Sequence, residues 1–185
     1  MIIRTAKKED AKRLLAIYGP YIETTAISFE YDVPTLEEFE NRITGTIPNY
    51  PYLVAEDETG IIGYIYAHQF HERKAFSHGA ELSMYIDMAK RKNGVGKALL
   101  AEMENILIRQ NVYVMYSCIA STDRKNDEHL TDASIKFHEK MGFTVTCKHP
   151  VCGYKFGKWY DIVWMEKRIN NQIREPKDFI PFSRL

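Results

Sequence analysis

Short apolar runs and amphipathic stretches alternate along the whole chain. Runs with the two-residue period or the continuous apolar character of strands fall at 2–5, 52–56, 61–67, 80–87, 112–119, 143–148 and 161–167. Helix-like spacing of apolar positions falls at 8–18, 36–43, 95–110 and 132–141. An antiparallel meander followed by two strand–helix pairs predicts one mixed sheet flanked by helices, an α/β fold.

Two polar clusters mark where elements begin and turn. Thr35 and Glu38 have the spacing of a capping box, in which Thr35 accepts a hydrogen bond from the Glu38 N–H and Glu38 reaches back. Residues 57–60 are polar and end in glycine, which predicts a β-hairpin between the strands on either side.

The length of 185 residues suits one α/β domain with a sizeable core. We expect that domain to cover residues 1–168. The tail at 169–185 contains two prolines and several apolar residues, so we expect it to pack on the domain or on a partner subunit.

Charge and composition exclude several classes of protein. The chain carries 25 Lys plus Arg against 25 Asp plus Glu, which argues against a general polyanion binder, so no nucleic acid partner is expected. No apolar run approaches membrane length and the first residues lack a signal-peptide pattern, so no membrane association and a cytoplasmic location are expected. The three cysteines lack the spacing of a metal site, and no metal is expected.

The loop before the helix at 95–110 is the most informative segment. It contains Gly94 and Gly96 directly after a strand, so several backbone N–H groups meet near the positive end of a helix. Four cations lie in the same stretch: Lys90, Arg91, Lys92 and Lys97. Such a loop suits an anion and above all a phosphate, although the loop alone also fits a solvated basic turn with a glycine at the helix start.

Further segments, in order and at matching spacing, give the chain a specific resemblance. They are 3–4 with 10–11, 39–43, 52–56, 63–67, 73–76, 81–86, the glycine loop, 133–143 and 153–165. Together they resemble the phosphinothricin N-acetyltransferase branch of the GNAT superfamily of N-acetyltransferases. The resemblance implies a GNAT fold, in which a mostly antiparallel twisted sheet contains two parallel strands that splay apart. It also implies acetyl-CoA as the acetyl donor and a small amine as the acceptor.

The same resemblance implies which residues hold the donor. The strand edge that pairs with the pantetheine arm corresponds to Met84, Tyr85 and Ile86, and the pyrophosphate loop corresponds to Arg91, Lys92, Asn93, Gly94, Val95, Gly96 and Lys97. In the family, an asparagine two positions before an Ala–Ser pair touches the pantetheine arm. This chain has Thr131 there, and Ser134 is the serine of the pair. The Thr131 hydroxyl could substitute for the asparagine, or Asn126 of the preceding loop could reach the same place.

Two titratable residues are the catalytic candidates. Acyl transfer to an amine requires a group that removes a proton from the ammonium, and Glu81 begins the donor strand where the family has a glutamate. Burial between Ala80 and Leu82 would raise its pKa towards a useful value. His138 stands four residues before Gly142, where this branch carries a histidine, and it could act as an acid, act as a base or only line the pocket.

The acceptor and its surroundings are less constrained by the sequence. Arg73 and Lys74 suit a carboxylate or phosphinate, and Ala75 and Phe76 complete a short loop that matches the family's acceptor segment, with Glu81 beside it. The expected acceptors are therefore amino-acid analogues such as phosphinothricin, methionine sulfoximine or methionine sulfone. The alternatives are another amine, such as a protein N-terminus, and an acyl-CoA-binding module without turnover. The resemblance and the aromatic residues of 154–164 also suggest a homodimer whose acceptor pocket borrows residues from the partner. The alternative is that these aromatic residues fill the core of their own chain.

Overall fold

The structure is a computed structural model that describes residues 1–91, 93–171 and 175–185. Its strands are β1 (Ile2–Thr5), β2 (Tyr52–Asp57), β3 (Gly60–Gln69), β4 (Gly79–Ile86), β5 (Val114–Ser121), β6 (Thr144–Lys155) and β7 (Lys158–Arg168). Its α-helices are α1 (Ala11–Thr24), α2 (Leu36–Thr46), α3 (Val95–Arg109) and α4 (Ala133–Lys140). Single 3₁₀ turns stand at Lys8–Asp10, Lys74–Phe76, Met88–Lys90 and Phe182–Arg184. None of these helices is both long and apolar enough to cross a membrane.

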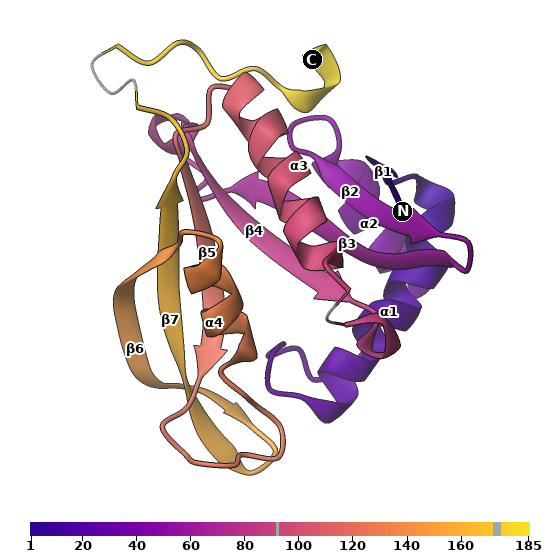
Figure 1. Cartoon of the computed structure of the whole chain (residues 1–185), viewed down its shortest axis with the longest axis vertical. Helices are drawn as coiled ribbons and strands as arrows, with labels where there is room; N and C mark the ends of the chain where they lie inside the picture. The colour runs from indigo at the N-terminus through magenta and orange to yellow at the C-terminus, as the bar shows by residue number, and fades with distance from the viewer. Residues whose placement is uncertain (92, 172–174) are drawn as a thin grey trace.

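One seven-stranded sheet runs through the chain in the order β1-β2-β3-β4-β5-β7-β6 (Figure 1). Every neighbouring pair is antiparallel except β4 and β5. The parallel pairing covers only Gly79–Glu81 of β4 opposite Val114–Tyr116 of β5, after which the two strands diverge. The predicted fold class, a mostly antiparallel mixed sheet with splayed parallel strands, is confirmed.

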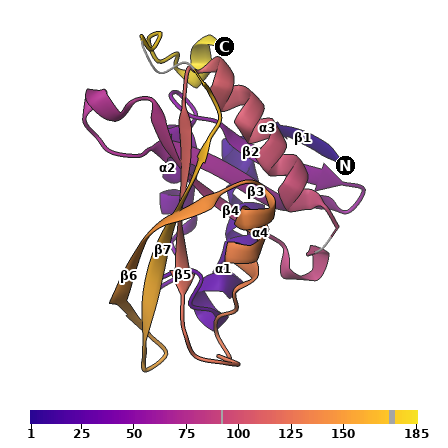
Figure 2. The ribbon, with the colours of Figure 1, turned by 60° about the vertical axis from the view of Figure 1, so that its left-hand side comes forward.

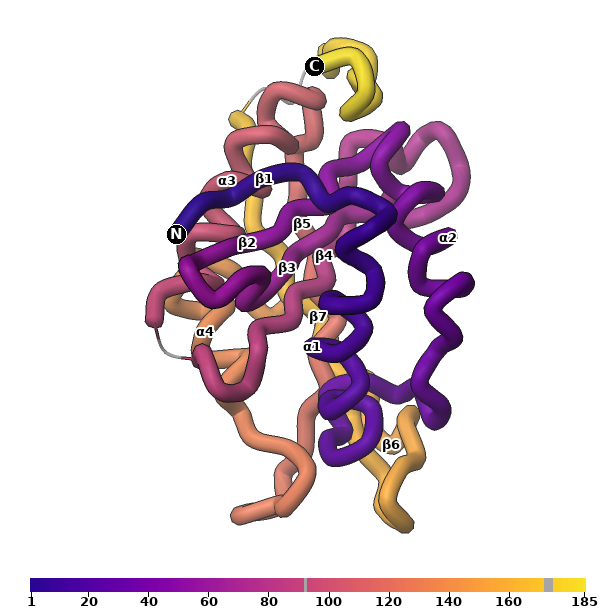
Figure 3. Tube along the Cα trace, turned by 90° about the vertical axis from the view of Figure 1, so that its right-hand side faces the viewer, coloured from indigo at the N-terminus to yellow at the C-terminus, as the bar shows by residue number. Residues whose placement is uncertain are grey.

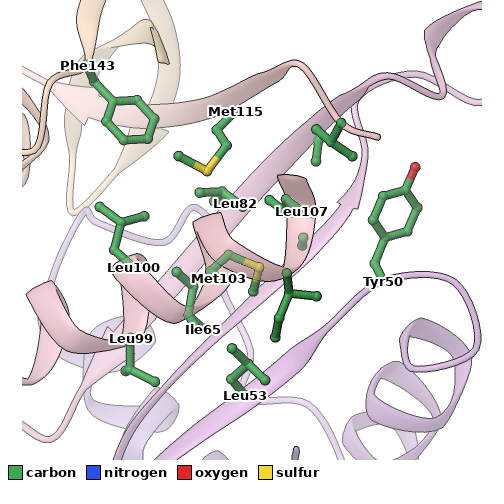
Figure 4. Close-up of a cluster of buried hydrophobic side chains, with 14 of the residues drawn as sticks. Tyr50, Leu53, Ile65, Leu82, Leu99, Leu100, Met103, Leu107, Met115 and Phe143 are labelled. Atoms are coloured by element: carbon green, nitrogen blue, oxygen red, sulfur yellow. The ribbon is translucent and has the colours of Figure 1, made fainter. Parts of the chain in front are cut away.

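Helices cover both faces of the sheet. Figure 3 shows α3 and α4 on one side and α1 and α2 on the other. The alternation of side chains along each strand divides the core accordingly. On β4, Leu82 packs into the cluster around α3, whereas Tyr85 packs against the cluster around α1. Figure 4 shows the α3 cluster, in which Leu99, Leu100, Met103 and Leu107 meet side chains of the strands.

Local signals placed the helices well, but their ends were less predictable. The capping box at α2 is confirmed, since Thr35 Oγ1 accepts from the Glu38 N–H at 3.2 Å and Glu38 Oε2 accepts from the Thr35 N–H at 2.7 Å. In contrast, α1 continues through Pro20 to Thr24, six residues beyond the predicted end. Burial of Tyr21 and Ile22 stabilises this last part of the helix despite the proline.

The hairpin of β6 and β7 is longer than predicted. The sequence suggested a short strand at 143–148, whereas β6 extends to Lys155 and turns directly into β7. The turn uses Phe156 at φ 52° and Gly157 at φ 69°, a pair of left-handed residues that matches the twist of an antiparallel hairpin. Figure 2 shows this hairpin extending past the body of the sheet.

A buried lysine ties this hairpin to the end of α1. Lys155 is 3 % exposed, and its Nζ donates to the carbonyl oxygens of Ile22 at 2.7 Å, Thr25 at 3.1 Å and Ser28 at 2.7 Å. The ammonium therefore satisfies a carbonyl of the last turn of α1, at Ile22, and two carbonyls of the segment that follows it. The segment that follows α1 is held in place by this contact.

Replacing Lys155 by methionine is expected to lower the free energy of unfolding by about 3 kcal/mol, because buried carbonyls lose a charged donor. Urea unfolding at pH 7 measures the change. Lys158→Met is the matched control on the next strand, since the Lys158 ammonium makes its 2.9 Å contact with Glu128 in solvent, and it should cost under about 1 kcal/mol. Equal costs for the two variants would contradict this role of Lys155.

The C-terminal residues lie across the end of α3, at the top of Figure 1. The Ile180 N–H donates to the Gln110 carbonyl at 3.0 Å, and the Phe182 N–H donates to the Asn49 carbonyl at 3.0 Å. Phe179 packs its ring 5.1 Å from that of Tyr50. The described part of the tail is therefore in contact with the body of the same chain.

Candidate active site

The divergence of β4 from β5 leaves part of β4 without a neighbouring strand. The Asp87 N–H donates to the Ile62 carbonyl at 2.9 Å, so the backbone groups of Asp87 point towards β3. In an antiparallel pair, residues whose backbone groups point towards the neighbouring strand alternate with residues whose backbone groups point away from it. By that alternation the backbone groups of Leu82, Met84 and Ile86 point away from β3, into the gap. Of the three residues predicted to form the donor edge, Met84 and Ile86 present backbone groups there, whereas the backbone of Tyr85 faces β3.

Tyr21 of α1 meets the end of this edge. Its hydroxyl donates to the Ile86 carbonyl at 2.5 Å and accepts from the Ile86 N–H at 3.3 Å. The Arg91 guanidinium lies 5.0 Å from the centre of the Tyr21 ring, a cation–π distance. Tyr21 thus connects the strand edge to the first residue of the predicted phosphate loop, a contact that no local sequence pattern predicts.

The glycine loop has the backbone of an anion site. Gly94 is the residue before α3 and has φ 77°, a left-handed conformation that side chains disfavour. The first N–H groups of α3 follow it, with Asn93 and Lys97 exposed beside them. Lys92, also predicted for this loop, lies outside the described residues. Val95 has another role, since it is 2 % exposed and anchors the helix in the core.

Gly96 differs from Gly94 because neighbouring side chains lie close to it. A Cβ at Gly96 would lie 3.3 Å from Cζ of Phe137 and 3.4 Å from Cε of Met84. A Cβ at Gly94 would meet nothing within 4 Å. Gly96 therefore allows α3 to approach α4 and β4 closely, whereas Gly94 supplies the backbone conformation.

His138 of α4 lies at the gap, and its hydrogen bond shows which ring nitrogen carries the proton. Its Nδ1 is 2.8 Å from the Ser134 carbonyl, which assigns the proton to Nδ1 and leaves Nε2 as an acceptor. Burial lowers the pKa of His138, so the ring is neutral near pH 7. The rings of Phe137 and Phe143 contact it edge-on at 5.3 and 5.0 Å.

A cavity of about 90 Å³ occupies the gap. Most of its lining comes from β4, β5, α3 and α4, and it includes Leu82, Met84, Leu100, Ser117, Cys118, Ser134 and His138. Strand edges, a glycine loop and this cavity are adjacent along β4. Unpaired backbone amides at one end and an anion site at the other suit an elongated ligand that contains amides and phosphates.

Glu81 projects from β4 towards the face of the sheet that carries α1 and α2. Burial raises the pKa of Glu81, and nearby His68 partly opposes the shift. His68 stands directly opposite on β3, with its Nε2 3.8 Å from Glu81 Oε2. A half-buried carboxylate with a raised pKa is suited to accept a proton near neutral pH. The sequence did not identify His68 as a site residue, because only the register of the hairpin brings it to Glu81.

A second cavity of about 170 Å³ lies on the same face. Its lining is mostly aromatic: Tyr18, Phe39, Arg42, Thr46, Tyr52, Tyr64, Tyr66, His68 and Tyr85. Arg42, the arginine in this lining, is paired with Glu30 at 2.8 Å. Burial raises the pKa of the Tyr66 and Tyr85 hydroxyls, so they stay neutral.

The residues predicted for the acceptor follow β3. Arg73, Lys74, Ala75 and Phe76 are all exposed in the connection to β4. Lys74 and Ala75 line a groove of about 1160 Å³ that also reaches His68. Phe76 faces a different hollow, with Phe70 and Tyr116. Thr131 is exposed, and its Oγ1 accepts from the Ala133 N–H at 3.4 Å.

The two catalytic candidates therefore approach the donor strand from different sides. Glu81 stands with His68 on the α1 and α2 face, whereas His138 lines the gap from α4. Among the described residues no group of three or more His, Cys, Asp or Glu side chains could hold a metal ion. The arrangement can hold a phosphorylated, amide-containing ligand on one side and present a proton acceptor on the other.

Comparison with known proteins identifies the family of the chain. The family described as "Acetyltransferase (GNAT) domain" matches residues 3–164. An L-methionine sulfoximine/L-methionine sulfone acetyltransferase of Salmonella typhimurium is 30% identical over 171 residues, which are 92% of this chain and 95% of that protein.

Solved structures show the same fold. A phosphinothricin acetyltransferase of Sinorhizobium meliloti, crystallised with acetyl-CoA, has a TM-score of 0.87 at 28% identity, covering 99% of this chain and 97% of that one. A ribosomal-protein-alanine N-acetyltransferase of Brucella melitensis has a TM-score of 0.79 at 32% identity, covering 91% and 99%. The chain belongs to the GNAT family of acetyltransferases.

Proposed function

We propose that this protein transfers the acetyl group of acetyl-CoA to the amino group of a small, amino-acid-like acceptor by direct attack in a ternary complex. The observation that carries the proposal is the gap between β4 and β5, which begins directly after Glu81. The names of the relatives, which include methionine sulfoximine and phosphinothricin acetyltransferases, support the acceptor class.

Acetyl-CoA, when bound, supplies the acetyl group as a thioester. The residues present fit this donor, because the backbone groups of Met84 point into the gap and the loop at Gly94 offers the first amides of α3. The backbone groups of Ile86 point the same way, but both are bonded to the Tyr21 hydroxyl. Arg91 and Lys97 add positive charge beside those amides. Ser134 lines the gap, and Thr131 stands in the family's asparagine position, with its hydroxyl bonded within its own turn to the Ala133 N–H.

Glu81 is the proposed general base. The acceptor amine is mostly an ammonium at pH 7, so it must lose a proton before it can attack, and the raised pKa of Glu81 matches that task. His138 has its one proton on Nδ1, bonded to Ser134, and none on Nε2 to donate. We therefore assign His138 to the lining of the gap, where Nε2 accepts hydrogen bonds, instead of a role as the acid.

Arg73 and Lys74 are the proposed partners of the acceptor's carboxylate or phosphinate. Both are exposed cations, and Lys74 lines the groove that leads to His68 and so to Glu81. The tyrosine-lined cavity would receive the acceptor's side chain, because it is mostly aromatic and the guanidinium of its Arg42 is already paired with Glu30. A cytoplasmic location, where acetyl-CoA is available, is part of the same proposal.

A thiol-release assay tests this function. Acetyl-CoA is supplied with phosphinothricin, methionine sulfoximine, methionine sulfone, the common amino acids and a peptide with an N-terminal alanine. We expect turnover with at least one free amino acid or analogue, and none with the peptide. The peptide arm is included because one similar structure is named as a ribosomal-protein-alanine acetyltransferase. Turnover of the peptide alone would replace the small acceptor by a protein N-terminus, and no turnover with bound acetyl-CoA would indicate a binding module.

A homodimer is the proposed assembly. Four apolar side chains of the β6–β7 hairpin remain exposed, namely Val145 at 49%, Val151 at 60%, Tyr154 at 48% and Trp159 at 53%. Two of the four are aromatic, and a group of exposed apolar side chains that includes aromatic ones is typical of interfaces. Sedimentation at micromolar concentration should give about twice the 21.6 kDa of one chain. Trp159→Glu should then shift the protein towards the monomer, and a wild-type protein that sediments as a fully active monomer would exclude a shared acceptor pocket.

A further inference from the structure

A serine on β5 carries a buried hydroxyl that no protein group satisfies. Ser117 is 2 % exposed, and its Oγ has no hydrogen-bond partner among the described residues. The hydroxyl of Tyr50 and Oε1 of Gln110, in other parts of the fold, are also buried without a hydrogen-bond partner among the described residues. Buried hydroxyls are normally paired, because an unpaired one loses its bonds to water and gains nothing. Ser117 therefore needs an explanation that its own chain does not supply.

The position of Ser117 at the gap between β4 and β5 explains its unpaired hydroxyl. The parallel pairing of β4 with β5 ends at Glu81 and Tyr116, so Ser117 is the first residue of β5 beyond it. Its side chain shares a face with Met115 and Ile119, the face covered by α3 and α4. Ser117 lines the cavity in the gap, together with Leu82, Ser134 and His138. The unpaired hydroxyl thus lies at the closed end of the gap.

The direction of the gap indicates which part of a ligand reaches Ser117. The glycine loop follows the far end of β4, whereas Glu81 stands at the near end, where the strands still pair. A donor held by its phosphates at the loop must extend along β4 so that its acyl group comes close to Glu81. Its acyl end then lies where the strands begin to diverge, beside Ser117.

We propose that the Ser117 hydroxyl donates a hydrogen bond to the carbonyl oxygen of the thioester, which orients the acyl group and polarises its carbonyl. The inference rests on the proposed function, since it takes acetyl-CoA as the ligand of the gap. Ser117 is a binding and positioning residue in this scheme, and it forms no covalent bond. A hydrogen bond of this kind favours the acylated donor over the free thiol, which has no carbonyl at that end.

Ser117→Ala tests the inference by calorimetry, with acetyl-CoA and CoA titrated separately, and by thermal unfolding without ligand. We expect acetyl-CoA to bind roughly tenfold more weakly while the affinity for CoA changes by less than about twofold. The unfolding temperature should stay the same or rise, because the variant removes an unsatisfied buried hydroxyl.

Tyr50→Phe is the matched control, because it also removes a buried, unpaired hydroxyl. Figure 4 shows Tyr50 at one end of the core cluster and Phe143, which contacts His138, at the other. This variant should leave both affinities unchanged. Equal losses of acetyl-CoA and CoA binding in Ser117→Ala, no loss, or a lower unfolding temperature would each overturn the assignment of Ser117 to the carbonyl.

Failure of the proposed function gives a different result. A wild-type protein that binds acetyl-CoA but acetylates no amine leaves the calorimetric comparison intact and refutes only the reaction. A wild-type protein that binds neither acetyl-CoA nor CoA refutes both.

Discussion

Replacing Glu81 by glutamine is expected to lower kcat by about 10²–10⁴-fold while the affinity for acetyl-CoA stays nearly unchanged. Glutamine has the shape of the carboxyl group but cannot take the proton of the acceptor's ammonium. Glu81 faces the α1 and α2 side with His68, away from the cavity in the gap, so its loss should not disturb the donor. Steady-state kinetics and calorimetry with acetyl-CoA measure the two effects separately.

The pH dependence supplies an independent check of Glu81. Because its pKa is raised by burial, kcat/KM should rise with pH through that pKa and then level off as the base becomes ionised. In Glu81→Gln this limb of the profile should disappear. Burial also makes the ionised Glu81 carboxylate unfavourable in the folded protein. Because the pKa is higher in the folded than in the unfolded state, the stability that Glu81 contributes is fully present below its unfolded-state pKa and is lost as pH rises through its folded-state pKa. Glu81→Gln should therefore unfold at the same or a higher temperature at pH 7.

Glu166→Gln is the matched control for Glu81→Gln. Glu166 lies in the same row of the sheet, since Tyr116 pairs with Glu81 on one side and with Glu166 on the other. The two side chains are equally covered, with 21% of Glu81 and 22% of Glu166 exposed. Glu166→Gln should keep kcat within about twofold. Loss of acetyl-CoA binding in Glu81→Gln, or an equal loss of kcat in both variants, would assign Glu81 a structural role.

The parts of the site that sequence predicted are those defined by local order. The strand, the glycine loop and α3 follow one another in the chain, so the order of residues alone places Gly94 at a helix start. The capping box of Thr35 and Glu38 spans four residues, and it formed as predicted. Local signals of this kind depend on backbone chemistry that hardly changes with the rest of the fold.

Long-range contacts explain what the sequence could not reveal. His68 reaches Glu81 only through the register of β3 and β4, and a shift of one residue would turn its ring to the other face. Tyr21 binds Ile86 across 65 residues of sequence because α1 continues past Pro20, against the local preference of proline. Ser117 resembles an ordinary strand residue until the position of the gap is known. Each of these contacts depends on tertiary packing, which periodicity does not encode.

The tests of the phosphate loop depend on the difference between its two glycines. Gly94→Val is expected to weaken acetyl-CoA binding at least roughly 100-fold, equivalent to about 2.7 kcal/mol, while the protein stays folded. Valine disfavours the left-handed φ of 77° at this position, so the loop would change conformation and the first N–H groups of α3 would turn away from the anion. Gly96→Val is less informative, because its side chain would also displace Phe137 and Met84.

Two variants separate backbone conformation from other effects of Gly94→Val. Gly94→Asn introduces a side chain that tolerates the left-handed region and has open space around its Cβ, so it should retain more affinity for acetyl-CoA than valine does. Gly157→Val imposes similar strain at φ 69° in the turn between β6 and β7, and calorimetry should show unchanged acetyl-CoA binding. If Gly94→Val bound acetyl-CoA like the wild type, the pyrophosphate would have to be held elsewhere. If asparagine and valine weakened binding equally, space at Gly94, and not its backbone conformation, would be what the anion requires.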